Sequence, residues 1–372
     1  MDWRKYRSHF PSLERITFLN HAGVCLLSNR VLSAIQKALE SGMTGVAPYE
    51  ELDRSRELFS RIINARPDEV ALVPSTTYGI NLVASSLKIS KGDRVVLNDL
   101  EFPSNVYPWL KLAEKGAEVT WIRSSNGMLS LEDYEKALRN GAKVVPISHV
   151  QWCTGFRVDL KALSELAHEH GALLVVDAMQ SVGALQVDVK RCDIDILVCG
   201  SHKWLLGPEG AAFLYVREDL VESIFPSFVG WRSVVHEQPD KFDLSTIKLH
   251  SNARRFELST LPLICFVGLN ASMEMLLEAG LENVEQRVLS LAERLSIALQ
   301  DEGFTLQSPT CKEHMSGIVN VKVENYVEVV RELRKRNIIA SARMNGVRVS
   351  PHFFNSEEDL DKFIRELKSL VE

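Results

Sequence analysis

Short apolar runs alternate with segments of helical periodicity between residues 69 and 216 of this 372-residue chain. The apolar runs have the length and composition of buried strands. Helical patterns at 130–139 and 160–170 provide crossover connections between them. This alternation predicts an α/β fold with a mostly parallel central sheet flanked by helices. The expected strands are 69–74, 94–97, 118–122, 144–148, 173–177, 194–199 and 211–216.

The alternation fades after about Arg255, and the remaining sequence has a different pattern. Residues 262–301 have helical periodicity throughout. Further on, apolar runs and helical segments are mixed, at 317–323, 326–336, 338–343 and 356–371. We therefore expect a large domain of residues 1–255, which includes the N-terminal segment, and a smaller α+β domain of residues 256–372. No repeat or low-complexity linker divides them.

The amino-acid composition of the chain limits the kinds of partner and the cellular compartment that we expect for it. The net charge of −6 gives no reason to expect nucleic acid or a membrane surface as partner. The segment 1–7 lacks the apolar core of a signal peptide, and no apolar stretch is long enough to span a bilayer. Six cysteines without CxxC spacing argue against a metal site and favour a reducing compartment. We expect a soluble, cytoplasmic protein.

Lys203 lies in a loop that follows the expected strand at 194–199 and is flanked by Gly200 and Gly207. A lysine that is desolvated in such a loop has a lowered pKa and can form a Schiff base with an aldehyde cofactor. The simpler interpretation is a solvated loop lysine, which is the commoner case after a strand. Neighbouring motifs are needed to decide between the two.

Two further motifs match the needs of pyridoxal phosphate. Asp177 ends the expected strand at 173–177, at the sheet edge where open α/β folds bind ligands, and a carboxylate there can pair with the pyridinium nitrogen. Ser75, Thr76 and Thr77 begin an apolar helix, so their hydroxyls and free N–H groups form a phosphate cradle. Each motif alone fits an ordinary turn or helix cap. Together with Lys203 they predict a cofactor site.

With these motifs the chain resembles the class V aminotransferase family of fold type I pyridoxal-phosphate enzymes, which includes cysteine desulfurases, kynureninases and isopenicillin N epimerase-like proteins. The resemblance implies a fold type I architecture and pyridoxal 5'-phosphate as cofactor. It covers nearly the whole chain, through the segments 18–23, 75–77, 176–181, 201–204 and 347–355.

The resemblance implies roles for the residues that match the family motifs. Lys203 would form the Schiff base with the cofactor and then move the Cα proton of the substrate. Asp177 would keep the ring nitrogen protonated, because a carboxylate beside it favours the cation. Gln180 matches the position that contacts the phenolic oxygen of the ring. Thr76 and His202 would bind the phosphate.

Weaker matches imply four more residues near the cofactor. Phe102 stands where desulfurases have a stacking histidine and kynureninases a phenylalanine, so it would stack on the ring; the alternative is a core aromatic. Gln151 would touch the cofactor or substrate. Ser201 is shifted by one position from the serine of the desulfurase motif. Thr260 matches a residue that reaches the phosphate of the neighbouring subunit, which implies a symmetric homodimer with shared active sites.

The substrate side of the site is implied by four residues. Arg348 matches the arginine that binds the α-carboxylate of the amino-acid substrate, since a planar guanidinium holds a carboxylate by two parallel hydrogen bonds. Arg343 matches a second, weaker position. Asn20 and His21, in the N-terminal segment, would line the pocket entrance.

These parts suffice for an aminotransferase acting on the Cα amine of an α-amino acid, which is the activity that we expect. The alternatives are Cβ cleavage by a sulfur lyase or a kynureninase-like hydrolase, epimerisation, or a non-catalytic binding module on the same fold. The presence of Lys203, Asp177 and Thr76 argues against the binding module. The sequence does not show which side chain the amino-acid substrate carries.

The sequence argues against sulfur transfer by a desulfurase. Such enzymes need a mobile cysteine in a loop between the equivalents of Arg343 and Arg348. Here only residues 344–347 lie between them, without a cysteine, and Phe102 replaces the acid-base histidine. Cys311, the nearest cysteine in sequence, is expected to be a loop or structural thiol. We therefore expect no protein-bound persulfide.

Overall fold

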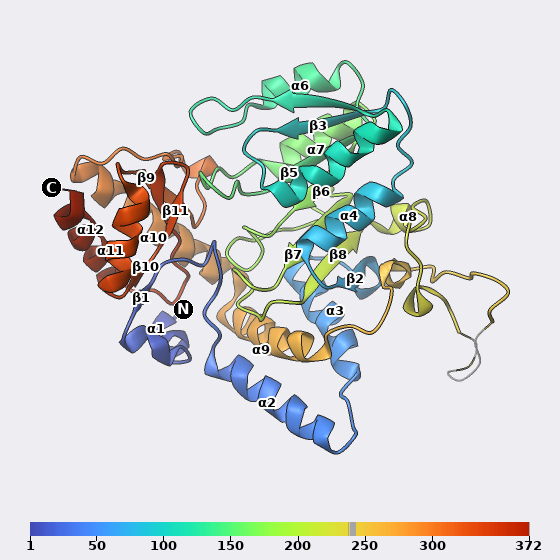
Figure 1. Cartoon of the computed structure of the whole chain (residues 1–372), viewed down its shortest axis with the longest axis horizontal. Coiled ribbons are helices and arrows are strands. Elements are labelled where there is room, and N and C mark those ends of the chain that lie inside the picture. The colour runs from blue at the N-terminus through green and yellow to red at the C-terminus, as the bar shows by residue number, and fades with distance from the viewer. Residues whose placement is uncertain (237, 239–242, 372) are drawn as a thin grey trace.

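The computed structural model describes residues 1–236, 238 and 243–371, which form two lobes side by side (Figure 1). The larger lobe is built, in the described part of the chain, on a seven-stranded sheet of order β2-β8-β7-β6-β5-β3-β4. Its strands run parallel except for β8, which is antiparallel to both of its neighbours. The predicted mostly parallel sheet is therefore confirmed. The strands are β2 (Val70–Val73), β3 (Arg94–Asn98), β4 (Glu118–Ile122), β5 (Val144–Ser148), β6 (Leu173–Asp177), β7 (Ile196–Gly200) and β8 (Ala212–Val216).

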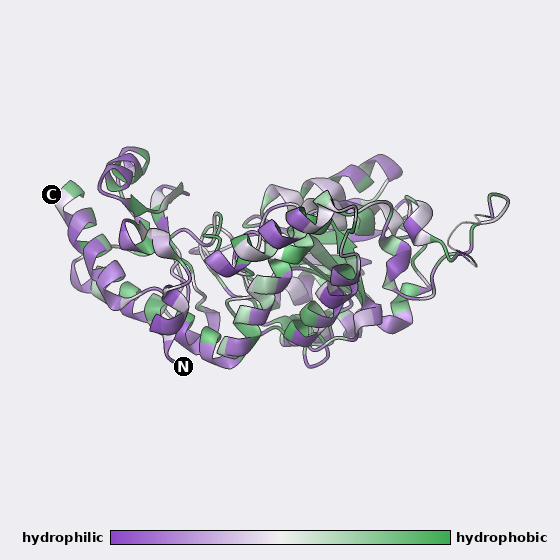
Figure 2. Ribbon diagram, turned by 90° about the horizontal axis from the view of Figure 1, so that it is seen from below, coloured by the Kyte–Doolittle hydropathy of each residue, from purple (hydrophilic) through white to green (hydrophobic). Residues whose placement is uncertain are grey.

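Side chains of the central strands alternate between the two faces of this sheet. In β5, Val145 and Ile147 pack into one hydrophobic core, whereas Val144 packs into the other. Because both faces are covered, the strands read as continuous apolar runs in the sequence. Figure 2 shows hydrophobic residues gathered around the sheet and hydrophilic residues on the outer turns of the helices.

Helices cover both faces of the sheet. Residues of α4 pack in one core and residues of α7 in the other. The helices predicted at 130–139 and 160–170 are α6 and α7, with ends within one residue of the prediction. Two long helices near the N-terminus, α2 and α3, were not predicted. The helices of this lobe are α2 (Asn29–Met43), α3 (Glu50–Ile63), α4 (Thr76–Ser86), α5 (Tyr107–Leu110), α6 (Leu131–Leu138), α7 (Leu160–Glu169), α8 (Glu218–Val221) and α9 (Leu263–Ala279).

The smaller lobe has the predicted α+β composition. It contains a three-stranded antiparallel sheet of order β11-β12-β9 and a parallel pair of β1 with β10, packed against α10, α11 and α12. Since β1 is N-terminal, the start of the chain joins this lobe, whereas α9 packs on α2 and α3 of the large lobe. The domain limits 1–255 and 256–372 stay a prediction. The remaining elements are α1 (Trp3–Arg7), β1 (Thr17–Phe18), α10 (Leu281–Asp301), β9 (Val319–Lys322), α11 (Tyr326–Lys335), β10 (Ile338–Ile339), β11 (Ser341–Arg343), β12 (Gly346–Val349) and α12 (Glu357–Val371).

Among the described residues, no single helix has both the length and the apolar composition to cross a membrane. The helices α9 and α10 reach the required length and apolar composition only when they are taken together, and this pair is bent by 84° at Gly280. Most of the apolar residues of α9 are buried inside the protein, which is typical of a core helix.

Candidate active site

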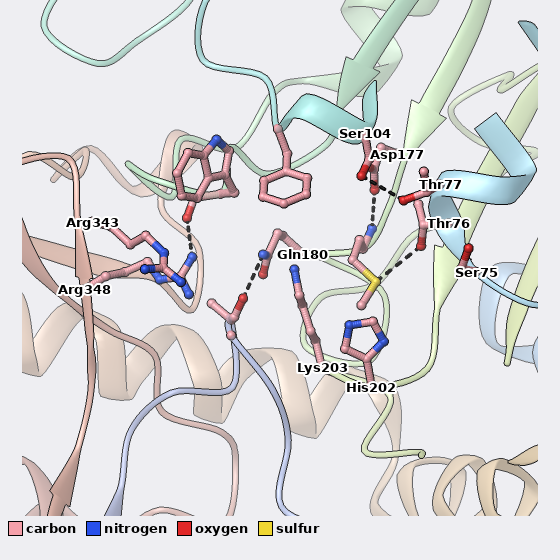
Figure 3. A pocket seen from close by; sticks show the side chains of 15 residues that line it. Ser75, Thr76, Thr77, Ser104, Asp177, Gln180, His202, Lys203, Arg343 and Arg348 are labelled. Atoms are coloured by element: carbon pink, nitrogen blue, oxygen red, sulfur yellow. Dashed lines mark hydrogen bonds between the residues drawn. The ribbon is translucent and has the colours of Figure 1, made fainter. Parts of the chain in front are cut away.

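A pocket of about 270 Å³ lies beyond the carboxyl ends of the central strands, between the two lobes. This is the edge at which open α/β sheets bind ligands. Figure 3 shows side chains of the fifteen residues that line it. Arg343 and Arg348 lie on one side of the pocket, Thr76 and Thr77 lie on the opposite side, and Lys203 projects between them.

Lys203 lies three residues after the end of β7, with its amine in the pocket. The amine nitrogen is 5.7 Å from the ring centroid of Phe102, and it has no hydrogen bond or ion pair with the described residues. Burial lowers the pKa of Lys203, the nearby guanidinium of Arg348 lowers it further, and the carboxylate of Asp177 opposes both effects. A lysine in this setting has a larger neutral, nucleophilic fraction than one at the surface.

Asp177 is the last residue of β6 and is buried at the pocket floor. Its Oδ1 accepts a hydrogen bond of 2.9 Å from the backbone N–H of Met179, whereas Oδ2 has no partner among the described residues. Burial raises the pKa of Asp177, and the nearby carboxylate of Glu101 adds to this. A cation placed against Oδ2 would reverse the shift, because an opposite charge favours the ionised carboxylate.

The start of α4 forms a cradle of hydrogen-bond donors. Ser75 caps the helix by accepting a hydrogen bond of 3.1 Å from the N–H of Tyr78. The N–H groups of Thr76 and Thr77 have no partner in the described structure, as is usual for the first turn of a helix. The hydroxyls of Thr77 and Ser104 lie 2.8 Å apart across the cradle. These donors and the helix dipole suit a phosphate group.

The hairpin of β11 and β12 places Arg343 and Arg348 in the pocket. Arg348 is only 2% exposed, and its Nη1 donates to the carbonyl of Trp152 at 2.7 Å. Burial lowers the pKa of Arg348 to about 9, and Arg343 adds to this shift. Neither arginine forms an ion pair with a carboxylate of the described chain. Two unpaired guanidinium groups in a pocket form a receptor for anions.

Glu101 organises the wall of the pocket that carries Phe102. Its buried carboxylate accepts hydrogen bonds from the N–H of Ser148 at 2.7 Å, from Asn105 at 3.0 Å and from Gln151 at 3.0 Å. Gln151 is fully buried in this network and does not line the pocket. Its predicted contact with a cofactor or substrate therefore stays a prediction.

Four other predicted site residues also lie outside the pocket lining of this chain. The hydroxyl of Ser201 donates to the carbonyl of Pro208. His21 is fully buried, with its Nδ1 3.1 Å from the carbonyl of Ser350. Asn20 accepts a hydrogen bond from Ser341. Thr260 is exposed in this single chain.

Comparison with known proteins matches residues 18–365 to the family described as aminotransferase class-V. The chain belongs to the class-V aminotransferase family. The resemblance that was inferred from the motifs is thus confirmed, and this class-V chain is a pyridoxal-phosphate-dependent enzyme.

Two relatives and one solved structure show that the similarity extends over most of the class-V chain. It is 32% identical to an uncharacterised aminotransferase of Bacillus subtilis, over 98% of this chain and 96% of the relative. It is 31% identical to a probable cysteine desulfurase of Pyrococcus abyssi, over 87% and 83% of the two chains. The solved apo structure of a cysteine desulfurase from Thermococcus onnurineus superposes with a TM-score of 0.90 at 25% identity, covering 99% of this chain and 97% of that one.

The pocket of the class-V chain fits pyridoxal phosphate group by group. The unpaired amine of Lys203 suits the aldehyde, and the unpaired Oδ2 of Asp177 suits the ring nitrogen. The free N–H groups of Thr76 and Thr77 suit the phosphate, and His202 lies at the same end of the pocket (Figure 3). The residues that line the pocket therefore match the chemical groups of the cofactor.

Several lining residues of the class-V chain were missed in the sequence analysis. Trp152 and Ser104 line the pocket beside the predicted residues Gln151 and Phe102. Trp152 meets the ring of Phe102 edge to face at a centroid distance of 5.5 Å. Trp152 directly follows Gln151 and Ser104 lies two residues after Phe102, but no local pattern shows which side chain of such a loop faces the pocket.

Proposed function

We propose that this class-V chain is an aminotransferase, which moves the amino group of an α-amino acid to an acceptor keto acid. The observation that supports it best is the pairing of two groups in one pocket. Lys203 presents a free amine, and Arg348 presents a buried guanidinium whose Nε has no partner among the described residues. An amino acid whose α-carboxylate binds Arg348 has its Cα toward Lys203.

The residues of the pocket have separate tasks in this reaction. Pyridoxal phosphate, when bound, withdraws electrons from the substrate carbon that loses its proton. Arg348 fixes the α-carboxylate by two parallel hydrogen bonds. Lys203, with a pKa lowered by burial, would accept the proton from Cα of the amino acid. In the half-reaction with the acceptor keto acid, it would donate a proton to the corresponding carbon. Asp177 stabilises positive charge at the ring nitrogen.

The hairpin and the cysteines favour amino transfer over sulfur transfer. The strands β11 and β12 are joined by only Met344 and Asn345, so there is no mobile loop beside Arg348. Cys153 is buried behind the pocket wall, and burial raises its pKa to about 11, so its thiol is protonated. Cys311 is exposed and does not line the pocket. The name of the relative in Bacillus subtilis also supports an aminotransferase.

Single-turnover and multiple-turnover assays separate the candidate reactions. The purified holoenzyme is incubated with one amino acid at a time, with and without an acceptor keto acid. An aminotransferase gives about one keto acid per active site without the acceptor and many with it. Continued release of sulfide, pyruvate, alanine or the opposite enantiomer without an acceptor would instead identify a lyase, a kynureninase-like hydrolase or an epimerase.

A matched pair of variants tests the role of Arg348. We expect Arg348→Lys to lower kcat/KM by roughly 10- to 100-fold, because one charged bidentate contact is lost. The control is Arg331→Lys on α11, where Arg331 is 68% exposed in its side chain and pairs with Glu328. The control should keep the kcat/KM of the parent enzyme.

We further propose a symmetric homodimer in which Thr260 reaches the phosphate site of the second copy. The exposure of Thr260 supports this, as do the apolar side chains of Leu32, Leu39 and Met43, which are 55%, 55% and 87% exposed. Light scattering measures the dimer. Mixed dimers of Lys203→Ala with Thr260→Ala contain one site with both native residues, so mixing should restore activity. If mixing restores none, each site is complete within one chain.

A further inference from the structure

Arg343 and Arg348 point to the same face of the hairpin. In its register Arg343 lies opposite Gly346, and Arg348 lies opposite Ser341. Residues directly opposite each other share a face, as do residues two apart along a strand. Both guanidinium groups therefore enter the same pocket, as Figure 3 shows.

The turn of the hairpin fixes this register. Met344 and Asn345 have φ values of +48° and +58°, so both central residues of a two-residue turn adopt the left-handed conformation. At Gly346 an added Cβ would lie 2.3 Å from Oδ1 of Asn320, which leaves no space for a side chain opposite Arg343. A one-residue slip would turn both arginines out of the pocket, and the turn disfavours it.

Each arginine has one edge of its guanidinium group, a pair of N–H groups that point the same way, that remains free. Arg348 uses Nη1 for the carbonyl of Trp152, and its Nε is buried without a partner among the described residues. Arg343 uses Nη1 for the carbonyl of Ala342 at 2.7 Å. Its guanidinium carbon lies 6.0 Å from the ring centroid of Trp152, which keeps the group against the pocket wall. Each free edge can hold one carboxylate by two parallel hydrogen bonds.

The charges that line the pocket are not balanced. Among the lining residues described, two guanidinium groups, Arg343 and Arg348, and the amine of Lys203 face one carboxylate, Asp177. The donors that suit the cofactor phosphate lie at the opposite side, around Thr76 (Figure 3). A simple amino acid supplies one carboxylate and leaves one guanidinium unpaired. Enclosing that charge in a filled pocket without a partner is unfavourable.

On the basis of the proposed aminotransferase function, we propose that the substrate is an α-amino acid with a second acidic group in its side chain, and that Arg343 binds this group. The difference in burial supports the assignment of the two arginines. Arg348 is buried, which suits the group that holds the α-carboxylate, whereas Arg343 is half-buried, which suits the group that binds the outer, side-chain acid. Arg343 is thus the residue that determines specificity.

Binding without turnover tests this substrate class directly. The holoenzyme is titrated with succinate, glutarate, propionate and butyrate at constant ionic strength, and the absorption of the bound cofactor is followed. We expect the dicarboxylates to bind at least about tenfold more tightly than the monocarboxylates, and Arg343→Gln to remove most of this difference. The exposed control Arg331→Gln should retain it. Equal affinities for both kinds of acid in the parent enzyme would overturn the proposal, even if Arg343→Gln fails to fold.

Turnover distinguishes a wrong substrate class from a wrong reaction. The ratio of kcat/KM is measured for aspartate over asparagine and for glutamate over glutamine, which are pairs of nearly equal shape. We expect at least one ratio to be about ten or more, and to fall about tenfold in Arg343→Gln but less in Arg343→Lys. Keto acid formed equally well from both members of each pair would overturn the acidic substrate and keep the aminotransferase. Tighter binding of dicarboxylates without any keto acid would support the acidic ligand and contradict the aminotransferase.

Discussion

The indole of Trp204 donates a hydrogen bond of 2.9 Å to the side-chain carbonyl of Gln180. The amide of Gln180 donates in turn to the carbonyl of Ala22 at 3.0 Å, and Nε2 of His352 lies 3.0 Å from the carbonyl of Trp204. Trp204 directly follows Lys203. The peptide that presents the reactive lysine is therefore fixed from both lobes and from the N-terminal segment at once. Gln180 lines the pocket and its amide nitrogen has a second N–H, and its predicted contact with the cofactor ring stays a prediction.

A pair of glycine variants tests this close packing. At Gly183, where φ is +99°, an added Cβ would lie 2.3 Å from the carbonyl oxygen of Trp204. We expect Gly183→Ala to lower the free energy of unfolding by about 2–4 kcal/mol, because backbone strain and a clash with backbone add up. Gly42 in α2 has open space around its Cβ position, so Gly42→Ala should raise the free energy of unfolding by about 0.5–1 kcal/mol. Denaturant unfolding measures both, and a shift of the same sign in the two variants would contradict the packing argument.

Asp177→Asn separates binding of the cofactor from catalysis. The variant keeps the size of the side chain and removes the charge that stabilises a protonated ring nitrogen. We expect the cofactor to remain bound through the start of α4, while kcat falls by about 100-fold or more. Equilibrium dialysis measures the cofactor and a keto-acid assay measures kcat. Near-parent turnover would exclude this role for Asp177.

His352 should make the stability of the protein sensitive to acid. Burial lowers its pKa from 6.5 to about 4, so between these values the unfolded chain binds a proton that the folded protein does not. The free energy of unfolding therefore falls as pH falls through this window, by about 2 kcal/mol from this residue between pH 6.5 and 5. His352→Gln keeps an N–H donor for the carbonyl of Trp204 and cannot titrate. We expect a smaller loss of stability in the variant than in the parent over this range, and equal losses would refute the assignment.

Incubation with L-cysteine should leave no persulfide on the protein. Cys25, Cys153 and Cys199 are buried, and burial raises the pKa of each thiol. Cys311 is exposed but lies outside the pocket lining. Free sulfide from elimination is compatible with this prediction. Mass spectrometry of the intact protein and its peptides checks it, and a persulfide on Cys311 that forms at the rate of turnover would restore the desulfurase interpretation.

The sheet was predictable because its strands are buried on both faces. The strand predicted at 173–177 coincides with β6, and that at 144–148 coincides with β5. The helices α2 and α3 were missed. In α2 the apolar residues Val31, Ile35 and Ala38 recur at helical spacing, so its sequence did indicate a helix, which the prediction left out. The pairing of β1 with β10 joins residues 17 and 338, and a local pattern cannot reveal such a distant contact.

The part of the site that was predictable consists of residues whose type is required by the chemistry of the cofactor and whose position is marked by a strand end or a helix start. Lys203, Asp177 and Thr76 follow strands or begin a helix, and the structure brings all three into one pocket. The choice between Gln151 and Trp152 was not predictable. It depends on hydrogen bonds that Glu101 makes from about 50 residues away, which bury one side chain and leave its neighbour facing the pocket.

Chemical trapping of the cofactor on Lys203 tests the central claim most directly. The holoenzyme is reduced with borohydride and digested, and the peptides are examined by mass spectrometry for the mass of the reduced cofactor. We predict the modification on Lys203 alone, and no modified peptide from folded Lys203→Ala, since among the described residues Lys203 is the one lysine that lines the pocket. A modified peptide that contains a different lysine, in the parent or in the variant, would contradict the account.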